Sequence, residues 1–201
     1  MFERRNPLDG SVATRAPAAS PADAVMAADA AAEAFKRWSQ TGPGARRALL
    51  LKAADALEAR TPQFVEAVLA ETGATAMWAG FNVMLAAGMV REAAALTTQI
   101  SGEAIPSDVP GSLAMGMRQP AGVVLGIAPW NAPIILGVRA IDTPLACGNT
   151  VILKGSENCC PPNASSWTRK LPTSLFASWS PRPGRYRWVT RANRSPWCWA
   201  R

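Results

Sequence analysis

The sequence of 201 residues contains no histidine, and none of its four cysteines is paired in a CxxC spacing. Protein zinc sites are built mainly from paired cysteines and histidines, so these absences exclude a zinc site from the prediction. We therefore expect no bound metal. The sparse cysteines are also typical of reduced thiols, which indicates a cytoplasmic protein.

Long hydrophobic runs are absent as well. The uncharged stretches at residues 72–90 and 119–138 are diluted by glycine, alanine and polar residues, and the second contains Pro120, Pro129 and Pro133. Prolines in a lipid-embedded segment leave backbone groups without partners. The first residues also lack the apolar segment of a signal peptide. We predict no membrane span.

Acidic residues are missing from one end of the chain. Residues 158–201 contain eight Lys and Arg and no Asp or Glu, whereas residues 1–157 contain 13 basic and 14 acidic side chains. The same tail holds five of the eight tryptophans and shows no helical or alternating periodicity. We expect a folded domain at residues 1–157, followed by a tail that is disordered or arises from a changed reading frame. A basic, aromatic tail also leaves open a non-enzymatic protein that binds nucleic acid or acidic surfaces.

The first half of the chain predicts helices. Ser20-Pro21-Ala22-Asp23 has the pattern of a capping box with proline in the first turn, which starts a helix that runs to about residue 38. Further helices are predicted at residues 45–59, 61–72 and 75–100. Arg46 and Arg47 are adjacent bases of the second helix; a solvated helix face is the favoured interpretation, and a phosphate site is the alternative.

Strand patterns frame these helices. A turn signal at residues 6–10 predicts a hairpin near the start of the chain. Residues 103–110 look like a polar connector, and residues 112–119 alternate as a strand does.

The strongest pattern lies at residues 122–157. Residues 122–128 form an apolar run rich in β-branched side chains, which predicts a buried strand. Pro133 suits the first turn of a helix that Gly148 closes, and residues 149–154 predict a second strand. A strand, helix and strand in this span favour a parallel right-handed unit, with a ligand bound at the loop after the first strand.

Asn131 occupies that loop between two prolines. Its side-chain amide is an uncharged donor that can stabilise a developing oxyanion. A cap of the following helix is the simpler alternative, because asparagine is favoured at helix starts.

Three blocks in register, VLGIAPWNAP, PLACGNTVILK and Ser156-Glu157, resemble the cofactor-binding segment of NAD(P)-dependent aldehyde dehydrogenases. The resemblance covers residues 2–157 and is strongest to the aromatic-aldehyde branch that includes salicylaldehyde dehydrogenases. It implies an α/β fold: a partial Rossmann-like parallel sheet, an N-terminal helical layer and a β arm at residues 112–119 that mediates homo-oligomerisation in the family.

The resemblance also implies site residues. Asn131 would be catalytic, as a donor to the oxyanion formed when a cysteine attacks the aldehyde. Ile127, Ala128, Trp130, Lys154 and Glu157 would bind the cofactor. A carboxylate at Glu157 accepts the ribose 2′-hydroxyl and repels a 2′-phosphate, which favours NAD.

In the aromatic-aldehyde branch, Trp78 and Arg139 would line the substrate entrance. The alternatives are that Trp78 is ordinary core and that Asp142 neutralises Arg139 across one helix turn.

The family's nucleophilic cysteine and general-base glutamate match no position here. Cys147 lies on the predicted helix, and Cys159, Cys160 and Cys198 lie outside the matching pattern. We therefore expect an enzyme by descent, in a truncated form with little or no activity alone.

Overall fold

The computed structural model describes residues 2–16 and 18–155. The predictions made for Glu157 and for residues 158–201 lie outside this part of the chain.

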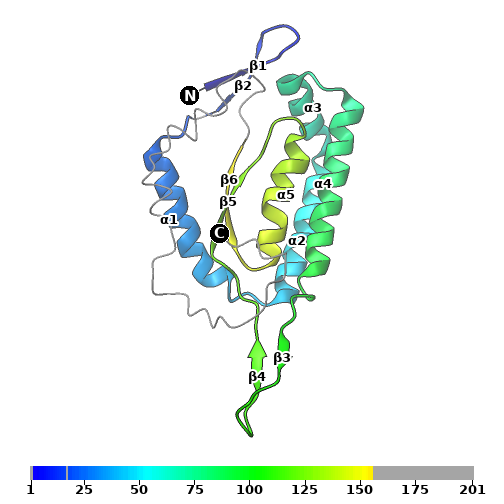
Figure 1. Ribbon diagram of the computed structural model, residues 1–201. Helices are drawn as coiled ribbons and strands as arrows, with labels where there is room; N and C mark the ends of the chain where they lie inside the picture. The colour runs from blue at the N-terminus through cyan, green and yellow to red at the C-terminus, as the bar shows by residue number, and fades with distance from the viewer. Residues whose placement is uncertain (1, 17, 156–201) are drawn as a thin grey trace. The chain divides into compact units, whose positions relative to one another are not determined.

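Four helices form a layer that precedes the parallel strands (Figure 1). They are α1 (Pro21–Trp38), α2 (Pro43–Ala59), α3 (Thr61–Thr72) and α4 (Ala76–Leu96). The predicted capping box starts α1, because the Asp23 amide donates to Ser20 Oγ (3.2 Å) and the Ser20 amide donates to the Asp23 carboxylate (2.7 Å). At the end of α3, Gly73 has φ of 67°, a left-handed conformation that glycine adopts readily.

Helix α4 packs against α2, α3 and α5 (Pro133–Ala146), and small side chains fill much of the contact. The central cluster consists of Leu50, Ala54, Ala87, Val90, Ala93, Ala94 and Ala146. The prediction that this helix continues to residue 100 was wrong. It ends at Leu96, where the Thr97 hydroxyl donates to the Ala94 carbonyl (2.8 Å) and satisfies one of the last carbonyl groups.

The predicted N-terminal hairpin is present as β1 (Phe2–Arg5) and β2 (Val12–Ala16), paired antiparallel. Glu71 of α3 anchors it. The Glu71 carboxylate accepts a hydrogen bond from Thr14 Oγ1 (2.8 Å) and forms an ion pair with Arg4.

The predicted strand, helix and strand unit is confirmed as β5 (Val123–Ile127), α5 and β6 (Thr150–Lys154). β5 and β6 pair in parallel, from Val123 beside Thr150 to Ile127 beside Lys154. Both strands contact α1 and α5. Figure 1 shows these helices on opposite faces of the two strands, so the sheet is covered as parallel sheets require.

A second hairpin leads into this unit. β3 (Glu103–Ile105) and β4 (Ala114–Gly116) pair antiparallel, so the prediction of an irregular connector at residues 103–110 was wrong in its first three residues. That strand is too short for alternation to reveal it. The apolar side chains Leu113, Met115 and Met117 are largely exposed, as expected of a projecting β arm.

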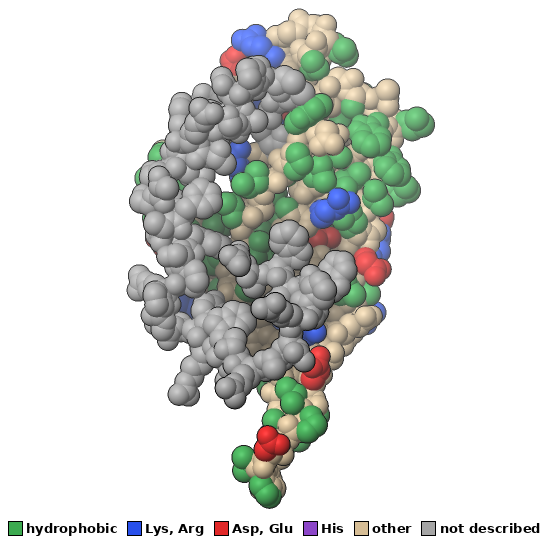
Figure 2. All heavy atoms as spheres, in the orientation of Figure 1, with side chains coloured by type: hydrophobic (Ala, Val, Ile, Leu, Met, Phe, Trp, Pro, Cys, Tyr) green, Lys and Arg blue, Asp and Glu red, His purple; other side chains and the backbone are tan. Residues whose placement is uncertain are grey.

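Helix α4 leaves apolar side chains at the surface as well, and Figure 2 shows hydrophobic groups gathered on the α3 and α4 side of the molecule. Its exposed face includes Met77, Trp78, Phe81, Met84 and Leu85. Among the described residues, no helix is both long enough and apolar enough to cross a bilayer.

Candidate functional site

The carboxyl ends of β5 and β6 bring three predicted cofactor residues side by side. Ile127 pairs with Lys154, and the Ala128 amide donates to the Lys154 carbonyl (3.1 Å). Ala128 is buried, whereas Ile127 and the following Trp130 are about half exposed. The hydrogen-bonded pairing of β5 and β6 therefore ends at exposed apolar side chains. This is the edge of the sheet where ligands bind in open α/β folds.

Asn131 lies in the loop that leaves this edge. The cap interpretation was wrong, because the N-cap of α5 is Ala132 and no side chain caps that end. Asn131 is exposed, and within the described residues its amide makes no hydrogen bond. The first amide groups of α5 add a partial positive charge beside it. A carbonyl oxygen that gains negative charge here would meet a donor and a favourable helix end.

Trp78 lies in the first turn of α4. Its ring stacks on Phe81 with centroids 5.6 Å apart and planes at 27°, and both side chains are 41% exposed. The alternative that Trp78 is ordinary core was therefore wrong. Sequence reasoning missed Phe81, although two aromatic residues three positions apart in the uncharged first turns of this helix were a usable signal.

Helices α4 and α5 run in the same direction, which places Trp78 near the Asn131 end of the molecule. The last turns of both helices, at Ala94 and Ala146, share one cluster. Their first turns consequently lie at the opposite end, as Figure 1 shows. Arg139 is exposed and lies six residues beyond Pro133, about 9 Å along the helix axis. The structure thus places Trp78 and Asn131 at one end, with Arg139 further along α5.

Asp142 does not neutralise Arg139 by an ion pair, since no such pair occurs among the described residues. The Asp142 side chain is buried, and its carboxylate accepts hydrogen bonds from the Thr143 amide (2.5 Å) and hydroxyl (3.2 Å). Burial raises the pKa of Asp142, while the Thr143 hydrogen bonds and, least of all, the Arg139 charge oppose the rise. The ionised form of Asp142 therefore lowers the stability of the folded chain relative to the protonated form.

Asp142→Asn is expected to raise the free energy of unfolding at neutral pH. The folded chain holds the Asp142 proton more tightly than the unfolded chain, so the stability that this proton contributes is complete below the ordinary pKa of 3.8 and is lost as pH rises through the raised pKa. The gain from the substitution should therefore grow with pH. Urea unfolding between about pH 4 and pH 8 measures it. Asp108→Asn, at an exposed position, is the control; an equal gain from both would contradict the prediction.

Cys147 is the free cysteine of the described residues, and it lies far from Asn131. Cys147 directly follows the last residue of α5 and Asn131 lies two residues before the first, so the 14-residue helix separates them by about 20 Å. No group of three or more potential metal ligands occurs in the described residues.

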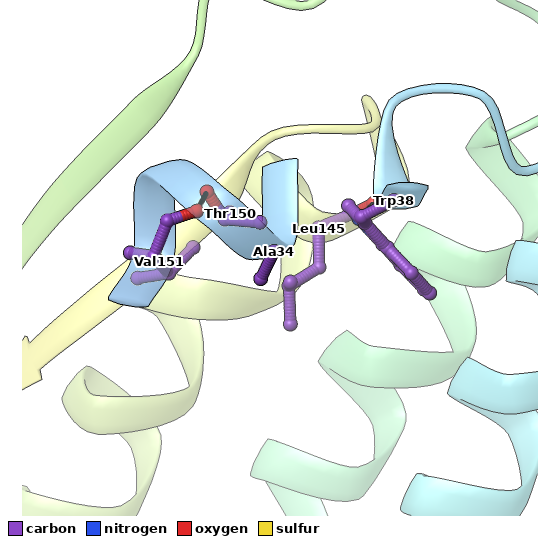
Figure 3. A pocket seen from close by; sticks show the side chains of 6 residues that line it. Ala34, Trp38, Leu145, Thr150 and Val151 are labelled. Atoms are coloured by element: carbon purple, nitrogen blue, oxygen red, sulfur yellow. Dashed lines mark hydrogen bonds between the residues drawn. The ribbon is translucent and has the colours of Figure 1, made fainter. Parts of the chain in front are cut away.

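An apolar cavity of about 290 Å³ lies at a different place, between α1, α5 and the start of β6 (Figure 3). Trp38 forms one wall, where its indole N–H donates to the Leu145 carbonyl (3.1 Å). Thr150 and Val151 line the cavity from the first residues of β6, whereas Lys154 ends that strand. The cavity therefore belongs to the opposite end of the sheet from the candidate site.

A parallel strand pair that is joined through a helix and contacted by helices α1 and α5 is an α/β arrangement, in which ligands bind at the carboxyl ends of the strands. The sequence model of the aldehyde dehydrogenase family matches residues 1–163. The chain belongs to the aldehyde dehydrogenase family.

Individual relatives agree. A vanillin dehydrogenase from a Pseudomonas species is 64% identical over 156 residues, covering 78% of this chain and 32% of the relative. The crystal structure of a salicylaldehyde dehydrogenase from Pseudomonas putida, complexed with salicylaldehyde, matches with a TM-score of 0.76 and 53% identity, covering 78% of this chain and 32% of that one. That of an NAD-dependent benzaldehyde dehydrogenase from Corynebacterium glutamicum matches with a TM-score of 0.73 and 34% identity, covering 76% and 33%. This chain thus spans about a third of the length of these relatives.

Proposed function

We propose that this chain supplies the first part of the cofactor site, and the oxyanion donor, for oxidation of an aromatic aldehyde to its acid with NAD. The observation that carries the proposal is the junction of β5 and β6, where Ile127, Ala128 and Lys154 meet at the start of the loop that carries Asn131. Ile127, Ala128 and Trp130 would contact the pyrophosphate and nicotinamide side of the cofactor. Lys154, with Glu157, would hold the adenosine ribose.

Asn131 would donate its amide hydrogen to the aldehyde oxygen as that oxygen becomes an oxyanion. Such a donor acts on charge that develops during the reaction, so it stabilises the transition state more than the bound aldehyde. When bound, NAD accepts the hydride that the aldehyde carbon loses.

An aromatic substrate is supported by two observations. The relatives named above are vanillin, salicylaldehyde and benzaldehyde dehydrogenases, all named for aromatic aldehydes. In this chain the exposed Trp78 and Phe81 rings offer a flat apolar wall. The Arg139 guanidinium would pair with a phenolic oxygen on the ring.

We also infer that copies associate through the β3–β4 hairpin, whose Leu113, Met115 and Met117 are exposed. A reducing, cytoplasmic setting suits the free thiol of Cys147.

We expect little or no turnover from this chain by itself. Attack on the aldehyde needs a thiolate within about 3.5 Å of the carbonyl carbon. Cys147, the free cysteine of the described residues, lies at the far end of α5 from Asn131. The other three cysteines lie outside the pattern that resembles the family. The chain can therefore bind the cofactor without oxidising an aldehyde, so cofactor binding is the property that tests the proposal.

NADH is expected to bind saturably to the 201-residue chain, and Lys154→Gln should weaken this binding about tenfold, because a charge-assisted hydrogen bond is lost. A fluorescence titration of NADH measures the affinity. NADPH should bind more weakly than NADH, since its 2′-phosphate would meet the Glu157 carboxylate.

Lys52→Gln is the matched control, because it removes the same charge from an exposed position of α2. It should leave the affinity for NADH unchanged. Absence of saturable binding, or equal weakening by both substitutions, would overturn the proposed cofactor site.

A further inference from the structure

Asn149 links three segments at the end of the sheet opposite the candidate site. Its side chain is only 8% exposed. The Asn149 Oδ1 atom accepts hydrogen bonds from the amides of Ala121 (2.7 Å) and Gly122 (2.9 Å), and its Nδ2 donates to the Pro144 carbonyl (3.3 Å). The start of β5, the end of α5 and the start of β6 are therefore held by one side chain.

The end of α5 fixes Asn149 itself. Gly148, with φ of 83°, donates to the Leu145 carbonyl (3.0 Å), and the Asn149 amide donates to the Pro144 carbonyl (2.9 Å). These two bonds form a Schellman motif, which determines the backbone path after a helix. The Asn149 side chain consequently projects from a defined backbone.

The contact with β5 continues the ladder of the sheet. Backbone pairing begins at Val123 beside Thr150, and the Thr150 amide donates to the Gly122 carbonyl (3.1 Å). One step earlier, Asn149 Oδ1 takes the place of a backbone acceptor for the Gly122 amide. Gly122 has φ of 134°, a backbone conformation that residues with a side chain rarely adopt. The chain therefore enters β5 through a bend, and the hydrogen bond from the Gly122 amide to Asn149 Oδ1 holds this bend.

The register of β5 against β6 at their first residues decides which residues lie side by side at their last residues. Each strand has five residues, and Asn149 immediately precedes β6, the strand that ends at Lys154. A slip of one residue would move Ile127 away from Lys154 and turn every side chain of β5 to the opposite face. Short strands in a two-stranded sheet specify register only weakly by themselves, so an additional fixed point matters.

We propose that Asn149 is a positioning residue: it sets the register of β5 against β6, and so the place of the loop carrying Asn131 relative to Lys154. This inference rests on the proposed function for its consequence, since that function needs Asn131 and Lys154 at one ligand. The part of the inference that concerns the register rests only on the hydrogen bonds of Asn149.

Amide hydrogen exchange of the full chain tests the register directly. In Asn149→Ala we expect the Gly122 amide to exchange about tenfold faster, and the Ala128 amide, which donates to Lys154 at the far end of the strands, to be accelerated as well. Asn149→Asp retains an acceptor for the Ala121 and Gly122 amides, so both sites should remain protected.

Thr150→Val is the matched control. It removes a part-buried side-chain hydrogen bond of the adjacent residue, from Thr150 Oγ1 to the Ala31 carbonyl (2.8 Å), and leaves the backbone groups of Thr150 free to pair with β5 as before. The Ala128 amide should stay protected in this variant. The inference would be overturned if the Ala128 amide stayed protected from exchange in Asn149→Ala, or if it exchanged equally fast in Thr150→Val. It would also be overturned if the Gly122 and Ala128 amides lost their protection in Asn149→Asp. If Asn149→Ala does not fold, the exchange of these amides in Asn149→Asp decides.

NADH titration separates this inference from the proposed function. We expect Asn149→Ala to weaken NADH binding about tenfold and Asn149→Asp to restore it. If the unaltered chain shows no saturable NADH binding, the proposed function fails, while the exchange of Ala128 still decides the role of Asn149. If NADH binds but Asn149→Ala binds it equally well, the positioning role is overturned and the proposed function stands.

Discussion

Arg46→Met is expected to lower the free energy of unfolding by about 3 kcal/mol, the largest loss among the substitutions considered. Arg46 is only 8% exposed, and its Nε donates to the Ala146 carbonyl (3.0 Å) while its Nη1 donates to the Thr41 carbonyl. Its positive charge also meets the carboxyl end of α5, where a cation is favourable. Methionine keeps much of the side-chain volume but leaves both carbonyl groups without this donor.

Arg47→Met is the control, since Arg47 is the exposed neighbour on the same helix. It should change stability by less than about 0.5 kcal/mol. Urea unfolding followed by helical circular dichroism measures both variants. Similar losses in the two would mean that the buried hydrogen bonds of Arg46 contribute nothing beyond ordinary helix propensity.

Gly126→Ala is expected to lower the free energy of unfolding by about 2 kcal/mol, because β5 approaches α5 too closely for a side chain at this position. A Cβ atom on Gly126 would lie 2.8 Å from the Cβ of Ala140 and 3.2 Å from its carbonyl oxygen. Pro144 lies four residues after Ala140 and has no N–H to bond that carbonyl. Relief of the clash would require β5 and α5 to separate.

Gly137→Ala provides the opposite expectation on the same helix. An added Cβ there meets no atom within 4 Å, and alanine restricts the unfolded chain more than glycine does. Its free energy of unfolding should rise by about 0.5 to 1 kcal/mol. Thermal unfolding distinguishes the two variants, and a loss of stability at both positions would show that the close approach at Gly126 is not the cause.

Local patterns correctly predicted the elements whose signals lie within a few residues. The capping box from Ser20 to Asp23 depends on backbone groups next to it, and it is observed. The parallel pairing of β5 and β6 followed from the connection between them, which is long enough for one crossover helix, as parallel neighbouring strands require. The role that the family resemblance gives to the loop at Asn131 stays a prediction.

Patterns were wrong where a partner lies far along the chain. Arg46 and Arg47 are equivalent in local sequence, and the favoured solvated interpretation was wrong for Arg46, because its acceptor at Ala146 is 100 residues away. The cap interpretation of Asn131 was wrong because α5 begins one residue later, at an N-cap without a side-chain bond. The spacing of Trp78 and Phe81 was readable in the sequence, but only helix packing showed that this side of α4 is exposed.

The amino-acid sequence by itself determined the order of the helices and of every strand except the short β3, the family, and the chemical character of the loop after β5, since these follow from local backbone preferences and from motifs. Tertiary structure alone decided which of two adjacent arginines is buried, how closely β5 approaches α5, and that Asn149 joins both strands. The physical reason is that hydrogen bonds and packing between distant segments depend on where the chain folds back, which no short window of sequence contains.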